Sequence, residues 1–152
     1  MLVDRLNALQ SADILRRSHL FEGRYENLYL NEKRIPQITR LRELACQHAA
    51  EVLGLKPEAL TAGCWLNDMP PGSVTLTHCH DDDDELLSGV YYIDVPEHSG
   101  HLVLHHEGEQ VSVTPEAGKF VFFSPAIPHE VTRNASTRHR LSLGFNFGPA
   151  RI

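Results

Sequence analysis

Histidines and aspartates alternate in the middle of the chain, where His78, His80 and Asp82 stand two positions apart. Alternate residues of a β-strand point to the same side, so a strand through this segment would present all three side chains together. A further histidine, His129, lies 51 positions after His78 and opens another predicted strand. Two neighbouring ligands from one strand and a distant histidine from another are typical of a facial triad, which leaves positions on Fe(II) open for substrate and oxygen.

This spacing leaves two sets of metal ligands open. In one set, His78 and His80 join His129, which gives three histidines. In the other, His80 and Asp82 join His129, which gives two histidines and one carboxylate. The chain has ten histidines, and eight of them lie between His78 and His139, counting both ends. This clustering indicates a metal site more strongly than any single histidine does.

A second group with binding chemistry is Arg140 and Ser142, which share one face of a predicted strand soon after His129. A guanidinium makes a planar, two-pronged pair with a carboxylate, and a hydroxyl can donate a further hydrogen bond. These residues therefore suit the distal carboxylate of a small dicarboxylic acid. Arg138 competes for this role by its even spacing, but it lies beside a predicted turn where the strand has not begun.

The first part of the chain, residues 1–60, reads as helical. Apolar residues recur every three or four positions over residues 38–55, with Pro36 before them and Gly54 near their end, as expected for a helix. A less regular pattern predicts a helix over residues 2–17, and residues 25–30 read as a short strand.

From Ala62 onward the apolar period changes to two, and turn residues interrupt it at short intervals. We therefore predict a mainly β protein, a double-stranded β-helix (a jelly roll, cupin-like) with the N-terminal helices packed on one sheet. Residues 1–152 are expected to form a single domain, with a helical lead-in over 1–60 and a β-barrel catalytic core over 61–149. The predicted strands cover residues 63–67, 73–80, 86–94, 101–105, 110–113, 119–123, 129–132 and 140–147.

Composition narrows the class of protein. The chain has 152 residues, a net charge of -6 and three cysteines without a CxxC pair. The acidic balance argues against a nucleic-acid partner, and no apolar run approaches the roughly 18 residues of a membrane helix. Residues 1–10 lack the pattern of an export signal, so we expect a reduced, cytoplasmic protein. The helical part could supply the interface of a homodimer.

Several motifs together resemble the 2-oxoglutarate/Fe(II)-dependent oxygenases of bacteria and phage. The resemblance covers residues 62–149. Its residues are His78-x-His80-x-Asp82, Leu87-Ser-Gly-Val-Tyr-Tyr92, Ser99-Gly100, Gly118-Lys-Phe-Val-Phe-Phe123, Pro128-His129-Glu130-Val131 and Arg140-Leu-Ser142.

The resemblance implies a double-stranded β-helix with bound Fe(II), 2-oxoglutarate as cosubstrate and O2 as oxidant. His129 would be the distal iron ligand, and Arg140 with Ser142 would hold the 5-carboxylate of 2-oxoglutarate. One of the neighbouring Tyr91 and Tyr92 should face the pocket, and Tyr91 is the one assigned to the cosubstrate. The implied activity is hydroxylation of an unidentified small-molecule or peptide substrate.

Two other functions stay open at this point. Gly72, His78, His80 and Glu85 fit the start of the first cupin motif, which would make Glu85 a ligand of a metal enzyme that does not use 2-oxoglutarate. The third function is a non-catalytic ligand-binding barrel, in which the histidines only form hydrogen bonds. The barrel is common to all three, so function has to be argued from the site. Trp65 and Asn67, on the first strand of the barrel, could line the substrate mouth.

Overall fold

The computed structural model describes residues 1–79 and 84–150, so His80 and Asp82 lie outside the described residues. Two α-helices, two short 3-10 helices and ten strands follow one another along this part of the chain. They are α1 (Leu2–Asn7), η1 (Ser11–Asp13), β1 (Ile14–Phe21), β2 (Arg24–Leu30), α2 (Pro36–Leu53), η2 (Pro57–Ala59), β3 (Leu60–Met69), β4 (Thr75–His78), β5 (Leu87–Asp94), β6 (Leu102–His106), β7 (Glu109–Val113), β8 (Phe120–Phe123), β9 (His129–Val131) and β10 (Arg140–Pro149).

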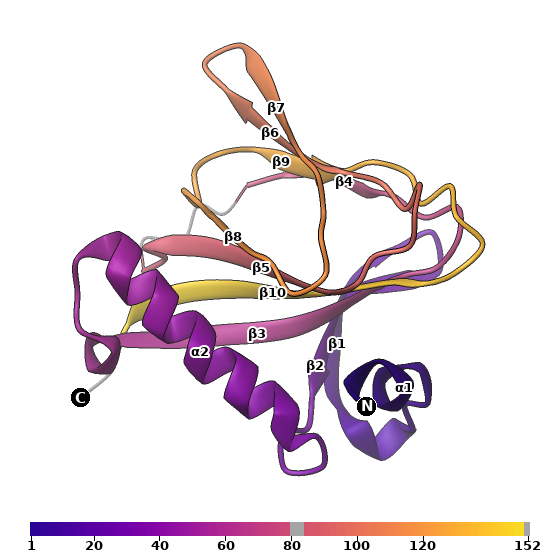
Figure 1. Ribbon diagram of the computed structural model, residues 1–152, viewed down its shortest axis with the longest axis horizontal. Coiled ribbons are helices and arrows are strands. Elements are labelled where there is room, and N and C mark those ends of the chain that lie inside the picture. The colour runs from indigo at the N-terminus through magenta and orange to yellow at the C-terminus, as the bar shows by residue number, and fades with distance from the viewer. Residues whose placement is uncertain (80–83, 151–152) are drawn as a thin grey trace.

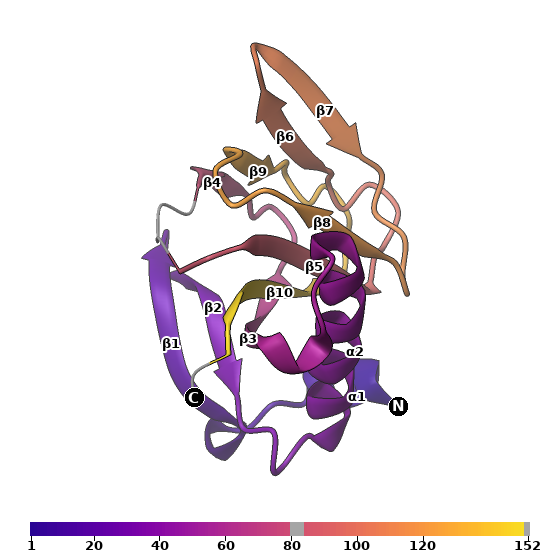
Figure 2. The ribbon, with the colours of Figure 1, turned by 90° about the vertical axis from the view of Figure 1, so that its left-hand side faces the viewer.

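The strands form two antiparallel sheets that face each other (Figures 1 and 2). The larger sheet has the order β1-β2-β3-β10-β5-β8, and the smaller has the order β4-β9-β6-β7. From β3 onward, each strand lies in the opposite sheet from the strand before it, except β7, which forms a hairpin with β6 in the smaller sheet. This alternation is the topology of a double-stranded β-helix. The fold class expected from the sequence is confirmed, and each of its eight barrel strands overlaps an observed one.

The helix α2 covers the outer face of the larger sheet (Figure 1). Pro36 occupies its first turn, where its missing N–H costs nothing, and Gly54 ends it in a left-handed conformation with φ 68°. Its small residues Ala45 and Ala49 are completely buried, which lets the helix lie close to the sheet. The expected packing of a helix on one sheet is therefore confirmed.

The N-terminal region differs from the helix predicted over residues 2–17. The helix α1 ends at Asn7, and β1 then pairs antiparallel with β2. Glu22 and Gly23 join the two strands with φ of 49° and 78°, the positive values of a tight hairpin turn. This hairpin adds two strands to the larger sheet, so the lead-in is not wholly helical: long-range pairing overrides the loose helical spacing.

No helix in the described parts of the chain has both the length and the apolar character needed to cross a membrane.

Candidate active site

Two of the predicted metal ligands meet across the smaller sheet. His78 ends β4, His129 begins β9, and the two are direct partners in the antiparallel register. Their ring centroids lie 4.2 Å apart. A register irregularity between Thr75 and His78 brings this pairing about, because it sets an extra residue of β4 against β9.

Backbone hydrogen bonds orient both imidazoles. Nδ1 of His78 lies 2.9 Å from the carbonyl oxygen of Leu76, and Nδ1 of His129 lies 3.0 Å from that of Ile127. A carbonyl oxygen can only accept, so Nδ1 of each neutral ring carries the proton and Nε2 carries the lone pair. Such a second bond is typical of metal-binding histidines, because it fixes the ring and its tautomer.

The two histidines differ in their surroundings. His129 is 7% exposed and packs edge-on against Phe123, with ring centroids 4.7 Å apart, whereas His78 is exposed. One imidazole is therefore fixed by packing, and the other lies at the open end of an edge strand.

A cavity of about 390 Å³ lies between the two sheets, with both histidines in its wall. Arg140, Ser142 and Tyr92 line the same cavity. The structure thus brings together four residues that the sequence connected only by spacing: His78, His129, Arg140 and Ser142.

Arg140 is the largest fully buried side chain in the described part of the chain, with 1% of its surface exposed. Its Nη1 lies 3.4 Å from the sulfur of Met69, and its guanidinium lies 5.4 Å from the ring centre of Tyr92. Nε has no hydrogen-bond partner among the described residues, and none of their ion pairs involves this side chain. Burial lowers the pKa of Arg140 from its ordinary value. A buried charge without a counter-charge is costly, so this position suits an anionic ligand.

Tyr92 is the tyrosine that faces the cavity. It is 1% exposed, and its hydroxyl has no hydrogen-bond partner among the described residues. Burial raises the pKa of Tyr92, so the hydroxyl keeps its proton and can donate it. Tyr91 points to the other side of β5, where its ring packs against Phe120 with centroids 4.6 Å apart. Of the two tyrosines, one of which was expected to face the pocket, alternation along β5 places Tyr92 in the cavity wall and Tyr91 outside it.

Arg138 and Arg140 lie in different environments. The side chain of Arg138 is 63% exposed and pairs with Asp94 at 3.5 Å. Arg140, two residues later, is buried and forms part of the cavity wall. Of the two arginines that the sequence offered for a diacid, only Arg140 is placed to reach one.

Trp65 and Asn67 line the cavity from β3, as expected of them. A Cβ atom on Gly144 of β10 would collide with the indole of Trp65. The absence of a side chain at Gly144 therefore allows Trp65 to lie against the sheet and keeps this part of the cavity open.

The wall also contains residues that the sequence analysis did not assign. Leu20 and Phe21 come from the end of β1, and Leu76 comes from β4. Leu20 and Leu76 are 61% and 53% exposed, so they form an apolar rim at the mouth. The turn at Glu22-Gly23 was the available signal for the hairpin that carries Leu20 and Phe21.

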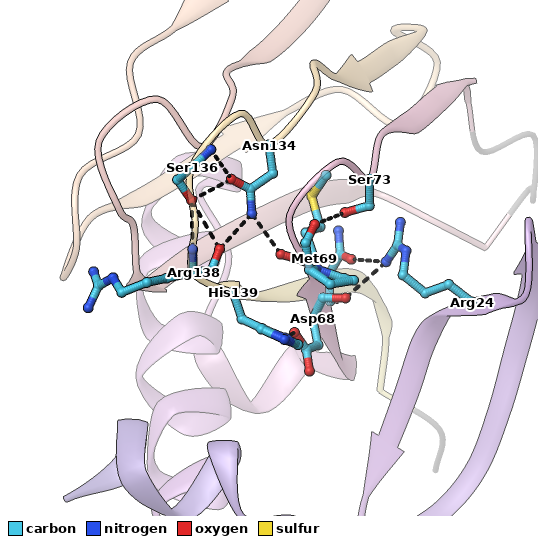
Figure 3. Close-up of polar contacts among 10 residues, drawn as sticks. Arg24, Asp68, Met69, Ser73, Asn134, Ser136, Arg138 and His139 are labelled. Carbon is cyan, nitrogen blue, oxygen red and sulfur yellow. Dashed lines mark hydrogen bonds and ion pairs between the residues drawn. The ribbon is translucent and has the colours of Figure 1, made fainter.

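Arg24 of β2 connects the β1–β2 hairpin to the rest of the site by hydrogen bonds (Figure 3). Its guanidinium donates to Oδ1 of Asn67 at 3.0 Å, to the carbonyl of Asp68 at 3.1 Å and to the carbonyl of Val74 at 3.2 Å. One side chain of β2 therefore joins the end of β3 to the segment that enters β4.

Glu85, the ligand expected from a cupin, lies near Ser88, whose hydroxyl donates to Oε1 at 3.4 Å. Ser88 lines the cavity, whereas Glu85 is outside its wall.

The chain belongs to the 2OG-Fe(II) oxygenase superfamily. That family matches residues 64–148, which is more than half of the chain. The match begins within β3 and ends within β10, so it contains most of the barrel and leaves out the N-terminal helices and hairpin. Membership confirms the resemblance found in the motifs and implies Fe(II), 2-oxoglutarate and O2. A search of curated proteins finds no match.

Solved structures of the same kind are similar to this chain. A prolyl-4-hydroxylase from Pseudomonas putida is 30% identical with a TM-score of 0.52, over 59% of this chain and 52% of that one. An oxidoreductase of the 2OG-Fe(II) oxygenase family from Burkholderia pseudomallei is 21% identical with a TM-score of 0.67, over 90% and 66%. The non-heme alpha ketoglutarate dependent epimerase SnoN from nogalamycin biosynthesis is 15% identical with a TM-score of 0.68, over 88% and 64%. The chain therefore spans between half and two thirds of the length of these structures.

Proposed function

We propose that this chain is an Fe(II)- and 2-oxoglutarate-dependent oxygenase that hydroxylates an organic substrate. The observation that carries the proposal is a buried guanidinium without a counter-charge in the same cavity as two facing imidazoles. Neither a cupin that does without 2-oxoglutarate nor a simple ligand-binding barrel needs this pair of features.

The donor set supports a metal ion. His78 and His129 would supply two Nε2 ligands, since the Nδ1 atom of each ring is bonded to a carbonyl. The third ligand would come from His80 or Asp82. The facing of His78 and His129 favours the set in which His78 is a ligand, namely His78, His80 and His129.

Arg140, Ser142 and Tyr92 support the diacid. The guanidinium would pair with the distal carboxylate, and the two hydroxyls would donate further hydrogen bonds to it. Anchoring one end of the molecule orients the other end toward the histidines, which removes rotational freedom before the reaction. Fe(II), when bound with 2-oxoglutarate and O2, would supply the oxidation of a C–H bond, and the chain supplies position and an enclosed site.

The substrate would enter on the side of the exposed apolar rim. Leu20, Leu76 and Trp65 form this part of the wall, so they would contact the group next to the reacting carbon. The family implies a small molecule or a peptide as substrate.

Anaerobic reconstitution with Fe(II) tests the metal part of the proposal. We expect the wild-type protein to retain iron after desalting and His129→Ala to lose it. His139→Ala is the matched control, because His139 is exposed and pairs with Asp68 at 2.7 Å, outside the cavity wall. Equal iron content in wild type and His129→Ala would contradict the proposed ligand. Consumption of 2-oxoglutarate by the iron-loaded protein then separates the oxygenase from the cupin-type enzyme.

A further inference from the structure

Asn134 lies in the loop between β9 and β10, and its side chain is fully buried. Its amide nitrogen donates to the carbonyl of Met69 at 2.9 Å and to the carbonyl of Arg138 at 2.9 Å (Figure 3). Its Oδ1 accepts from the backbone N–H of Ser136 at 3.0 Å, and the Ser136 hydroxyl lies 2.6 Å away. Two carbonyl acceptors on one side and an N–H donor on the other fix the orientation of the amide.

The backbone of Asn134 makes a second pair of contacts. Its N–H donates to the carbonyl of Ser73 at 2.9 Å, and its carbonyl accepts from the N–H of Gly72 at 2.7 Å. Gly72 and Ser73 precede β4, the strand that ends at His78. One residue therefore contacts the end of β3, the approach to β4 and the approach to β10.

These three segments hold the residues at the two ends of the proposed diacid site, which are Arg140 at one end and the two histidines at the other. Met69 is the register partner of Arg140, and its sulfur contacts the guanidinium. His78 ends β4, and His129 begins β9, five residues before Asn134. A shift of the Asn134 loop would therefore move Arg140 relative to the two histidines.

We propose that Asn134 is a positioning residue that fixes the span from the candidate metal histidines to Arg140, and so selects the length of the 2-oxo diacid. This inference rests on the proposed function. A ligand held at both ends is sensitive to the distance between its anchors, and a buried amide with four polar contacts resists a change in that distance.

Replacement of Asn134 by Asp tests the inference, because Asp keeps the shape and Oδ1 but lacks both N–H donors. Calorimetric titration of the anaerobic, Fe(II)-loaded protein would measure Kd for 2-oxoglutarate and for 2-oxoadipate, which is one methylene longer. A single methylene is worth tenfold or more in a well-fitted site, so we expect wild type to prefer 2-oxoglutarate by at least about tenfold. In Asn134→Asp we expect the preference to fall below about threefold.

Arg138→Ala is the matched control. It removes an exposed side chain next to Asn134 but leaves the Arg138 carbonyl that the amide contacts. We expect it to keep the wild-type ratio of the two Kd values. A residue that only stabilised the fold would lower the melting temperature and leave this ratio unchanged.

Ser136→Ala tests the role of Asn134 in length selectivity if Asn134→Asp does not fold. It removes one hydroxyl that contacts Oδ1 of Asn134 and the Arg138 carbonyl, and we expect a partial loss of length selectivity. An unchanged ratio in every folded variant would overturn the role of Asn134 while leaving the proposed function intact. A wild-type protein that binds neither diacid would overturn both.

Discussion

At the scale of single residues, the buried guanidinium of Arg140 contacts a thioether and no carboxylate of the described residues. The sulfur of Met69 is a weak, neutral acceptor, so it orients the guanidinium without neutralising it. The positive charge of Arg140 thus stays without a counter-charge among the described residues, which is the property that the proposed function uses.

Arg140→Ala should weaken binding of 2-oxoglutarate strongly. Loss of one partner of a buried, charge-assisted pair costs about 2–5 kcal/mol, which corresponds to at least about 30-fold in Kd. Titration calorimetry on the anaerobic, Fe(II)-loaded protein measures it, with Arg138→Ala as the exposed control. A Kd within twofold of wild type would show that the diacid is anchored elsewhere.

The two neighbouring tyrosines allow a paired comparison. Tyr92→Phe removes a buried hydroxyl from the cavity, and a hydrogen bond to a charged group contributes about 1.5–3 kcal/mol, so Kd for 2-oxoglutarate should rise about tenfold or more. Tyr91→Phe should leave Kd unchanged, because Tyr91 packs on the opposite side of β5. The reverse order of effects would restore the role of Tyr91 that the sequence suggested.

At the scale of elements, a strand is best predicted from the sequence where its two faces lie in different environments. Along β10, Arg140 and Ser142 line the cavity, whereas Leu141 between them lies in the core under α2. β1 has no such signal, because it is an edge strand in which no residue is buried. Its identity as a strand depends on pairing with β2, which spacing within β1 does not reveal.

The candidate site shows the same limit. The types of His78 and His129 pointed to a metal, but their facing depends on the register of β4 against β9 and on its irregularity. Asn134 and Met69 carried no signal, because their roles arise from backbone contacts between segments far apart in the chain. Residue type thus indicates a chemistry, and long-range pairing determines which of the candidate residues lie together.

The contact of α2 with the larger sheet should dominate the stability of that sheet. Leu66 of β3 is completely buried in this core, so Leu66→Ala should lower the free energy of unfolding by about 2–5 kcal/mol. Leu15→Ala, on the exposed part of β1, should change it by less than about 0.5 kcal/mol. Urea unfolding followed by circular dichroism measures both, and similar losses would contradict the placement of the core.

At the scale of the whole molecule, one buried carboxylate joins the N-terminal segments. Asp13 is completely buried and accepts from Arg5 of α1 at 2.6 and 2.9 Å and from Arg34, just before α2, at 2.7 Å. The backbone N–H of Gln10 adds a further bond of 2.8 Å. Arg5, Arg34 and this N–H hold the pKa of Asp13 well below its ordinary value of 3.8.

This depressed pKa predicts a loss of stability in acid. The ion pairs stabilise the folded state fully above the ordinary pKa of an aspartate, about 4, and their contribution declines as the pH falls further toward the pKa of folded Asp13. Asp13→Asn should therefore be less stable than wild type at pH 7, and the difference should shrink at pH 3. Urea midpoints of both proteins at the two pH values provide the comparison, and a constant difference would exclude Asp13 as the acid-sensitive group.

The contact between Gly144 and Trp65 has a consequence for how such a pocket could diversify. Because the indole of Trp65 occupies the space in which a Cβ atom on Gly144 would lie, a single extra carbon on β10 would force this part of the cavity wall to shift. The shape of the pocket is thus adjustable at one backbone position, without altering any group that would hold the iron or the diacid.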